Sequence, residues 1–301
     1  MSKRKVEIAP DKLTIFLKDN FSNDSKIISE FTGNEVTRAF LFSSKKKEYV
    51  IRVDSSIESF GKDNYAYGHF ASRKIIIPET VASGKIEEGL FFSITRKLQG
   101  ISLDKLTDGE FKIALPEICS VLERIHSIDI SKTSGYGEWG LSGNAPYKSW
   151  NDFLLSVKDS VYFNWNNLFK EGIMEKDLFD KAYGKMVDLS IYSTRERYLV
   201  HGDYGFNNIL IDKGKVSGVL DWAMSRYGDF VFDISWLALW EYRVDYGEIF
   251  KEYHKGKDLA NYDKRVLCNI MHAAITSLGF LAKWGDRKGY NFARNRLLKF
   301  L

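Results

Sequence analysis

The stretch His201-Gly202-Asp203-Tyr204-Gly205-Phe206-Asn207-Asn208 decides the fold of this 301-residue chain. Asn208 follows Asp203 by five residues, and a second aspartate, Asp221, follows Asp203 by eighteen. Between Asn208 and Asp221, short β-type runs at 209–211 and 216–220 flank the turn signal Asp-Lys-Gly, which predicts a β-hairpin. The sequence therefore predicts one rigid unit that carries two aspartates and an asparagine.

This spacing is typical of phosphoryl transfer. The reaction needs a carboxylate near the attacking hydroxyl and oxygen ligands for the magnesium ion that neutralises the triphosphate. We expect Asp203 to orient and deprotonate the acceptor hydroxyl, and Asn208 and Asp221 to hold Mg²⁺. His-Gly-Asp alone is also an ordinary turn sequence, so the interpretation depends on the spacing and the hairpin together. His201 is expected to have a structural role, with its ring packed beneath the loop.

The residues before this unit predict a β-rich lobe over residues 1–98. Strands are expected at 30–42, 48–54, 80–83 and 90–98, and helices at 11–20 and 62–73. The first of these strand regions contains the turn signal Gly-Asn, so it counts as two strands. Because consecutive strands follow one another without helical crossovers, we expect an antiparallel sheet of five strands.

The remaining residues, 99–301, predict a mainly helical lobe with the catalytic unit inside it. Helical spacing is found at 110–126, 150–168, 176–189, 230–242 and 265–284, while 131–147 predicts a loop. The chain is thus expected to have an α+β, bilobal protein-kinase-like fold, with an antiparallel β-sheet N-lobe and a mainly helical C-lobe.

Composition and charge narrow the class of protein. The net charge of +4 arises from 44 basic and 40 acidic residues that are intermixed along the chain, which argues against nucleic-acid binding. Cys119 and Cys268 lie in apolar helical patterns without metal-ligand spacing, as buried thiols do in a reducing compartment. We find no apolar stretch of membrane-spanning length and no signal-peptide pattern. A cytoplasmic monomer that binds no membrane is therefore expected.

The sequence resembles the aminoglycoside phosphotransferase family, whose signature is the His-Gly-Asp loop followed by a later aspartate. The resemblance covers most of the chain and includes Ser-Glu-Phe at 29–31, Arg-Ala-Phe at 38–40, Tyr-Val-Ile-Arg-Val at 49–53, residues 62–72 and Thr-Ser-Gly-Tyr-Gly at 133–137. Stretches such as 67–72 have no catalytic role and point to the hygromycin B branch. The resemblance implies ATP or GTP as phosphoryl donor and a cationic aminoglycoside, above all hygromycin B, as acceptor.

Carried over by position, the resemblance implies several nucleotide contacts. Arg52 occupies the place of the kinase lysine that contacts the α- and β-phosphates, and Asp63 is the nearest acid that could pair with it. A solvated aspartate at a helix start is an equal alternative for Asp63.

Two further segments are expected at the nucleotide. Gly33 and Asn34 would close over the phosphates, or would simply form a hairpin turn. Arg96 and Leu98 belong to the segment between the lobes, whose backbone groups would hold the base.

The acceptor site is expected at the helix that ends near Trp240, Glu241 and Asp245, where acidic and aromatic groups could hold a polycation beside Asp203. A tryptophan stripe at helical spacing is also typical of a buried core. Asp233 is expected to bind the backbone of the catalytic loop or to cap a helix.

Alternative functions remain at this point. A kinase of choline, a sugar or another aminocyclitol would use the same catalytic residues. A nucleotide-binding pseudokinase would require loss of Asp203, Asn208 or Asp221, and all three are present. A protein kinase is disfavoured because no Ala-Pro-Glu segment follows Asp221.

Overall fold

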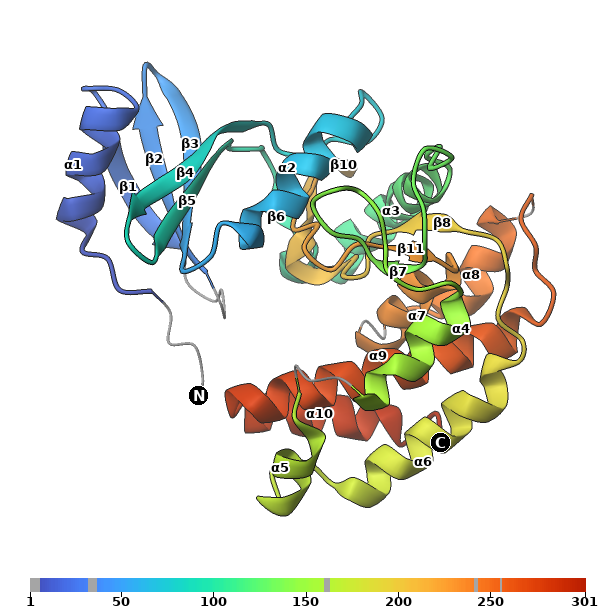
Figure 1. Cartoon of the computed structure of the whole chain (residues 1–301). Helices are drawn as coiled ribbons and strands as arrows, with labels where there is room; N and C mark the ends of the chain where they lie inside the picture. The colour runs from blue at the N-terminus through green and yellow to red at the C-terminus, as the bar shows by residue number, and fades with distance from the viewer. Residues whose placement is uncertain (1–5, 32–36, 160–162, 241–242, 255) are drawn as a thin grey trace.

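The computed structural model describes residues 6–31, 37–159, 163–240, 243–254 and 256–301 (Figure 1). The N-terminal part contains α1 (Pro10–Asn20), β1 (Lys26–Phe31), β2 (Arg38–Ser44), β3 (Lys47–Asp54), α2 (Glu58–Phe70), β4 (Thr80–Glu87) and β5 (Leu90–Arg96). Its strands form one antiparallel sheet in the order β1-β2-β3-β5-β4. The predicted five-stranded antiparallel sheet is confirmed, and β5 ends two residues before the predicted lobe boundary at 98.

Period-two alternation of apolar residues gives this sheet its own hydrophobic core. Phe40 and Phe42 of β2 and Ile51 of β3 are buried on the face covered by α1, which contributes Leu13 and Leu17 (Figure 1). Burial of each such side chain stabilises the fold by about 1.5–3 kcal/mol before entropy is counted. The α2 helix lies elsewhere, between the sheet and the rest of the chain, where it can hold groups from both parts.

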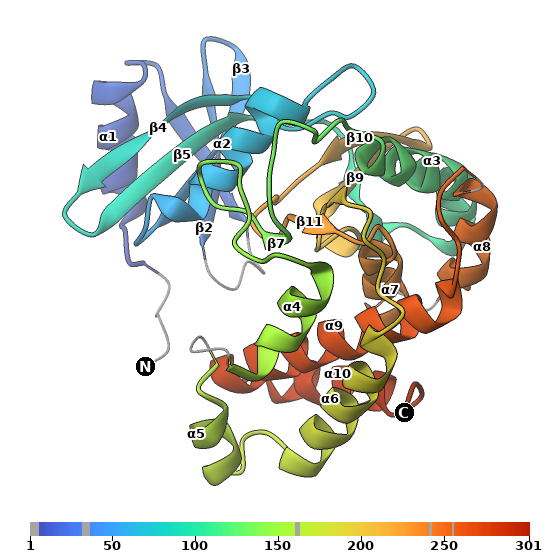
Figure 2. The same ribbon diagram turned by 45° about the vertical axis from the view of Figure 1, so that its right-hand side comes forward.

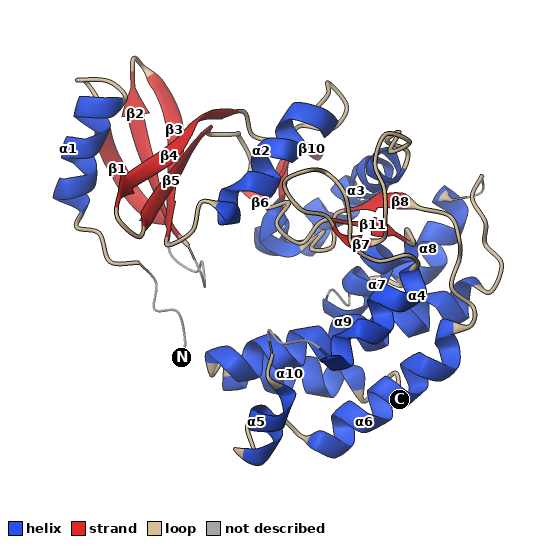
Figure 3. Ribbon diagram, in the orientation of Figure 1, coloured by secondary structure: helices blue, strands red, loops and turns tan. Residues whose placement is uncertain are grey.

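The C-terminal part is mainly helical (Figure 3). Its α-helices are α3 (Asp108–His126), α4 (Trp150–Leu155), α5 (Trp165–Lys170), α6 (Lys176–Ser190), α7 (Val231–Trp240), α8 (Tyr246–Tyr253), α9 (Tyr262–Trp284) and α10 (Arg287–Leu297). A capping box in which Thr107 and Glu110 exchange hydrogen bonds starts α3. The protein-kinase-like arrangement of an antiparallel sheet followed by a helical region is thereby confirmed.

The α9 helix is the central element of the helical part and packs against α6, α7 and α10. Within the described residues it is also the one helix long and apolar enough to cross a membrane, although 72% of its most apolar window is buried inside the protein. The sequence-based prediction that no apolar stretch reaches this length was therefore wrong. The apolar length of α9 is that of a helix in a protein core.

Two small three-stranded sheets lie between the large sheet and the helices (Figure 2). One has the order β10-β9-β6, from β6 (Ile101–Ser102), β9 (Ile209–Asp212) and β10 (Lys215–Val219). The other has the order β7-β11-β8, from β7 (Gly137–Glu138), β8 (Tyr198–Val200) and β11 (Arg226–Gly228). The predicted hairpin is the antiparallel pair β9–β10, and it joins the catalytic loop to Asp221.

Two sequence-based expectations in the helical part were wrong. The helix expected at 150–168 is divided into α4, a 3₁₀ turn at Ser156–Asp159 and α5. Asn164, directly before α5, has a left-handed backbone (φ 48°), which a continuous α-helix does not allow. The loop expected at 131–147 contains β7, because Gly137 adopts φ 87° and pairs with Tyr227 of β11. The α8 and α10 helices were not predicted.

Candidate active site

The catalytic loop is anchored from below by the buried carboxylate of Asp233, at the start of α7. Its oxygens accept hydrogen bonds from the backbone N–H groups of His201 (3.0 Å) and Gly202 (2.7 Å). The same carboxylate contacts Nε2 of His126 at 2.9 Å. Burial opposes the charge of Asp233, but the hydrogen bond and charge of His126, the charge of His201 and the hydrogen bond from Gly202 together outweigh it, and the pKa of Asp233 is lowered. The expectation that Asp233 holds the loop backbone is confirmed by this geometry.

The ring of His201 supports the loop through both of its nitrogen atoms. Its Nε2 lies 3.0 Å from the carbonyl oxygen of Leu220, and its Nδ1 lies 3.3 Å from the N–H of Asp203. Both contacts are satisfied by a neutral imidazole that donates through Nε2 and accepts through Nδ1. Burial lowers the pKa of His201 and so favours this neutral form.

Gly202 is required by the backbone at this point. Its φ is 83°, and a Cβ atom there would lie 2.1 Å from the carbonyl oxygen of Met224. Only glycine combines this conformation with so close an approach of two backbone segments. The middle residue of the His-Gly-Asp motif thus fixes the distance between the catalytic loop and the segment after Asp221.

Asp203 and Asn208 are joined directly. Nδ2 of Asn208 donates to Oδ2 of Asp203 at 2.7 Å and to its carbonyl oxygen at 3.0 Å. Burial and the nearby charge of Asp221 raise the pKa of Asp203 to about 7, against the opposing effects of Asn208 and Arg226. A carboxyl group that titrates near neutrality is suited to accept a proton from a hydroxyl group.

Asp221 lies two residues after the end of β10 in a left-handed conformation (φ 55°), which is uncommon for a residue other than glycine and is found preferentially at functional sites. Desolvation by the surrounding protein and the charge of Asp63 raise the pKa of Asp221, although the charge of Arg52 opposes this effect. The Asp221 side chain is exposed at the edge of a pocket, so a ligand can reach its carboxylate.

These side chains fit a magnesium ion. Asp203 and Asp221 are acceptor-only when ionised, Asn208 offers an amide oxygen, and oxygen ligands of this kind are those that Mg²⁺ prefers. Burial raises the pKa of both aspartates, with added repulsion from Asp221 on Asp203 and from Asp63 on Asp221, and a bound divalent cation would favour the ionised form of each. Asn208 and Asp221 would hold the ion, as the spacing in the sequence predicts.

A cavity of about 220 Å³ adjoins Asp221 and extends beneath the large sheet. It brings together five of the predicted site residues, namely Arg52, Asp63, Arg96, Leu98 and Asp221, along with apolar side chains from both parts of the chain. A cavity lined by charged groups and by apolar side chains is suited to a nucleotide.

Arg52 and Asp63 form an ion pair through Nη2 and Oδ2. The other oxygen of Asp63 accepts the N–H of Trp222 at 2.7 Å, next to Asp221. Asp63 therefore links β3, α2 and the segment that carries Asp221. Of the two alternatives for Asp63, the structure shows the pair with Arg52.

The segment between the two parts presents its backbone to the same cavity. The N–H groups of Arg96 and Lys97 donate to the carbonyl oxygens of Glu79 and Glu48, at 3.0 and 3.2 Å. A nucleotide base would therefore contact the carbonyl groups of this segment, or it would contact Leu98. The Arg96 side chain pairs with Glu79.

The residues predicted for the acceptor are less closely gathered. Trp240 stacks on Phe292 at 5.8 Å and contacts Phe206 of the catalytic loop edge to face at 6.4 Å. Asp245 is exposed and caps α8, where it accepts the N–H of Glu248 at 3.1 Å. The predicted residues Gly33, Asn34 and Glu241 lie outside the described residues.

Residues that the sequence did not single out also approach the site. Nζ of Lys62 donates to the carbonyl oxygen of Ser225 at 2.7 Å and lies 4.7 Å from the ring centroid of Trp139. Burial lowers the pKa of Lys62 to about 8. Arg226 is buried against Phe232, 4.2 Å from its ring. Lys62 and its partner are 163 positions apart, so no local pattern could reveal the contact.

The fold and the site together define a phosphotransferase of the protein-kinase-like class. The model of the phosphotransferase enzyme family (APH) matches residues 27–266, and the chain belongs to this family.

Individual relatives narrow the comparison. Hygromycin-B 4-O-kinase of Escherichia coli is 31% identical over 252 residues, which are 81% of this chain and 73% of the relative. A thermostable mutant of aminoglycoside phosphotransferase APH(4)-Ia, solved with AMP-PNP and hygromycin B, is similar with a TM-score of 0.85 and 27% identity, over 96% of this chain and 97% of that one. Another variant of the thermostable mutant, solved with ADP and hygromycin B, gives a TM-score of 0.84 at 28% identity, over 96% of this chain and 97% of that one.

Proposed function

We propose that this chain transfers the γ-phosphoryl group of Mg-bound ATP or GTP to a hydroxyl group of hygromycin B, and thereby confers resistance to the drug. The observation that carries the proposal is the group formed by Asp203, Asn208 and Asp221, which lies at the edge of the cavity lined by Arg52. The similarity to relatives that bind hygromycin B supports the choice of acceptor.

In the proposed reaction, the acceptor hydroxyl donates a hydrogen bond to the Asp203 carboxylate and attacks the γ-phosphorus in line with the leaving oxygen. As the new P–O bond forms, the bond to the β-phosphate oxygen breaks and the hydroxyl proton passes to Asp203. Bound magnesium would neutralise charge on the phosphate oxygens. Asp203 must be ionised before each turnover; its pKa is about 7 without a metal ion, and a bound cation would lower it and widen the pH range in which the base is ready.

Arg52 is proposed to contact the α- and β-phosphates. Its guanidinium is held in place by Asp63, which in turn is fixed by the N–H of Trp222. This chain of contacts would keep the phosphate-binding cation and the magnesium-binding aspartate in one fixed relation. Arg96 and Leu98 would hold the base, and the relatives solved with AMP-PNP and ADP favour adenine over guanine.

The acceptor-binding role of Trp240, Glu241 and Asp245 stays a proposal. Phe206 brings Trp240 next to the catalytic loop, so the aromatic face is near enough to take part in binding. Gly33 and Asn34 are proposed to close over the phosphates. We further propose that the lobes divide near residue 98 and that the protein is cytoplasmic. We also propose that it is a monomer, and light scattering on the purified chain tests this state.

A coupled nucleotide-turnover assay across an acceptor panel tests the function. The panel contains hygromycin B, kanamycin, choline and simple sugars, each with ATP and with GTP. We expect turnover with hygromycin B and not with kanamycin, and raised tolerance to hygromycin B in a sensitive bacterium. Turnover of choline or a sugar without hygromycin B would leave the mechanism standing and remove the proposed acceptor.

A further inference from the structure

A second cluster of potential ligand groups lies behind the catalytic loop. Glu123 and His126 are three residues apart near the end of α3, and His254 follows the last residue of α8. One ligand atom from each of the three lies within 4.8 Å of the other two. The two imidazoles are buried, with exposures of 2% and 1%.

Each of the two imidazoles contacts a carboxylate through one ring nitrogen and leaves its other ring nitrogen buried without a partner among the described residues. Nε2 of His126 contacts Asp233, which leaves Nδ1, and Nδ1 of His254 pairs with Glu123, which leaves Nε2. Within the described part of the chain, neither Nδ1 of His126 nor Nε2 of His254 has a hydrogen-bond partner. Buried nitrogen atoms without partners are costly unless a ligand satisfies them.

We propose that Glu123, His126 and His254 bind a zinc-class divalent cation, at a site separate from the magnesium site. Two histidines and one glutamate are a ligand set of zinc sites that keep one position open. Ligand atoms around tetrahedral zinc lie about 3.3 Å apart, so small side-chain movements would close the observed spacing. The contact of His126 with Asp233 is the carboxylate–histidine arrangement that orients metal-binding imidazoles.

The protonation states agree with this assignment. Burial opposes the charge of Glu123, but the hydrogen bonds from His254 and Lys257 prevail and lower its pKa to about 2. Burial lowers the pKa of His254 to about 4. At neutral pH the carboxylate is therefore ionised and the imidazole neutral, which are the forms that bind metal.

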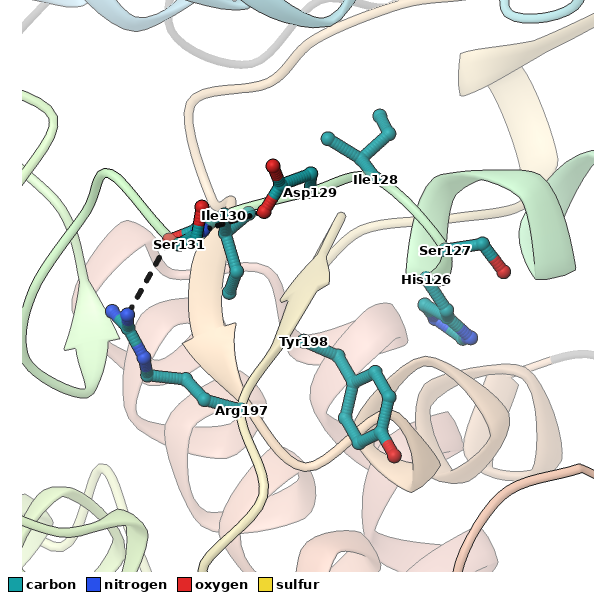
Figure 4. A pocket seen from close by; sticks show the side chains of 8 residues that line it. All are labelled: His126, Ser127, Ile128, Asp129, Ile130, Ser131, Arg197 and Tyr198. Atoms are coloured by element: carbon teal, nitrogen blue, oxygen red, sulfur yellow. Dashed lines mark hydrogen bonds between the residues drawn. The ribbon is translucent and has the colours of Figure 1, made fainter.

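The surroundings provide rigid walls and an approach. The ring of Phe230 lies 4.6 Å from that of His254 and 5.9 Å from that of His126, between centroids, which restricts the rotation of both imidazoles. A pocket of about 440 Å³ adjoins the end of α3, with His126, Arg197 and Tyr198 among the residues that line it (Figure 4). This pocket would admit the ion and a water ligand for the open position.

A bound cation would act on the catalytic loop through a short path. His126 contacts Asp233, and Asp233 accepts the N–H groups of His201 and Gly202. Fixing the imidazole of His126 would fix the carboxylate that holds the loop. Zinc should therefore slow hydrogen exchange of these two amide groups without touching Asp203 or Asp221.

Zinc titration of the metal-free full chain tests the proposal. A colorimetric chelator serves as competitor, and excess Mg²⁺ occupies the oxygen ligands of the active site. We expect one equivalent of zinc, with X-ray absorption showing nitrogen and oxygen ligands at about 2.0 Å. Glu123→Gln and His254→Gln should each weaken binding at least about tenfold. His69→Gln, on the exposed face of α2, is the matched control and should leave binding unchanged.

Lys257 supplies a variant that should strengthen binding. Its ammonium pairs with the other oxygen of Glu123, so Lys257→Met removes a competing positive charge and should lower the zinc Kd about tenfold. If His254→Gln fails to fold, the zinc Kd of Lys257→Met still tests the proposal. Three results would overturn the proposal: no stoichiometric zinc, binding that survives both ligand substitutions, or an unchanged Kd in Lys257→Met. The cluster would then be only a hydrogen-bonded pair of Glu123 and His254.

Discussion

Replacement of Asp203 by asparagine should make the metal-free protein more stable while it removes activity. Burial and the charge of Asp221 raise the pKa of this carboxyl from 3.8 to about 7. Between about pH 4 and about pH 7 the folded state keeps a proton that the unfolded state has released, so stability falls as pH rises through this window. Above about pH 7 the loss is complete, and Asp203→Asn should recover it.

The size of the gain follows from the shift. A change of about 3 pKa units corresponds to at most ~4 kcal/mol. The carboxyl is partly exposed, so solvent screening reduces this value to ~2 kcal/mol. With an unfolding entropy of about 2.1 cal/mol/K per residue, a chain of 301 residues should gain ~3 °C in Tm. Loss of the base should lower kcat by a factor of about 100 or more.

Scanning calorimetry at about pH 8 and about pH 4, with and without magnesium and nucleotide, measures the effect. Asp212→Asn, at the exposed last residue of β9, is the matched control and should leave Tm unchanged. The gain should vanish at low pH and should shrink when the cation is present. An Asp203→Asn variant that melts at or below the wild-type temperature at the higher pH, with a silent control, would refute the reasoning.

The other predictions concern the metal, the loop anchor and the acceptor. Asp221→Ala should abolish the magnesium-dependent part of nucleotide affinity, and identical titrations with and without Mg²⁺ in the wild type would contradict that role. Asp233→Ala leaves the N–H groups of His201 and Gly202 without their acceptor and should cost about 3–5 kcal/mol in urea unfolding, where a change below 1 kcal/mol would count against the anchor. Glu241→Lys should raise KM for hygromycin B much more than KM for the nucleotide, and equal effects would argue against acceptor binding there.

Local patterns predicted those parts of the fold that depend on neighbouring residues. The alternation in β2 and β3 and the turn signal between β9 and β10 are readable because side-chain direction and turn chemistry are set within a few residues. The division of 150–168 was not readable, since the left-handed Asn164 depends on how α5 packs beneath α9.

The same distinction holds for the site. Asp203, Asn208 and Asp221 lie within one short unit, so their spacing was sufficient to predict that they would gather. Lys62 was missed because its partner comes from a distant segment, and Arg226 was missed because its burial is a property of the folded chain. Asp63 was weighed against a solvated position, and only its contact with Arg52 across β3 and α2 decides between the two.

The most direct test of the central claim is the product formed by the purified chain with Mg-ATP and hygromycin B. Phosphorus and proton NMR report whether a phosphate ester appears on the drug and at which hydroxyl. We predict one phosphorylated hygromycin B per nucleotide consumed by the wild type, and product formation slower by a factor of about 100 or more with Asp203→Asn at equal nucleotide occupancy. An unmodified drug with the wild type, or equal phosphorylation by the variant, would contradict the assignment of Asp203 as the residue that activates the acceptor.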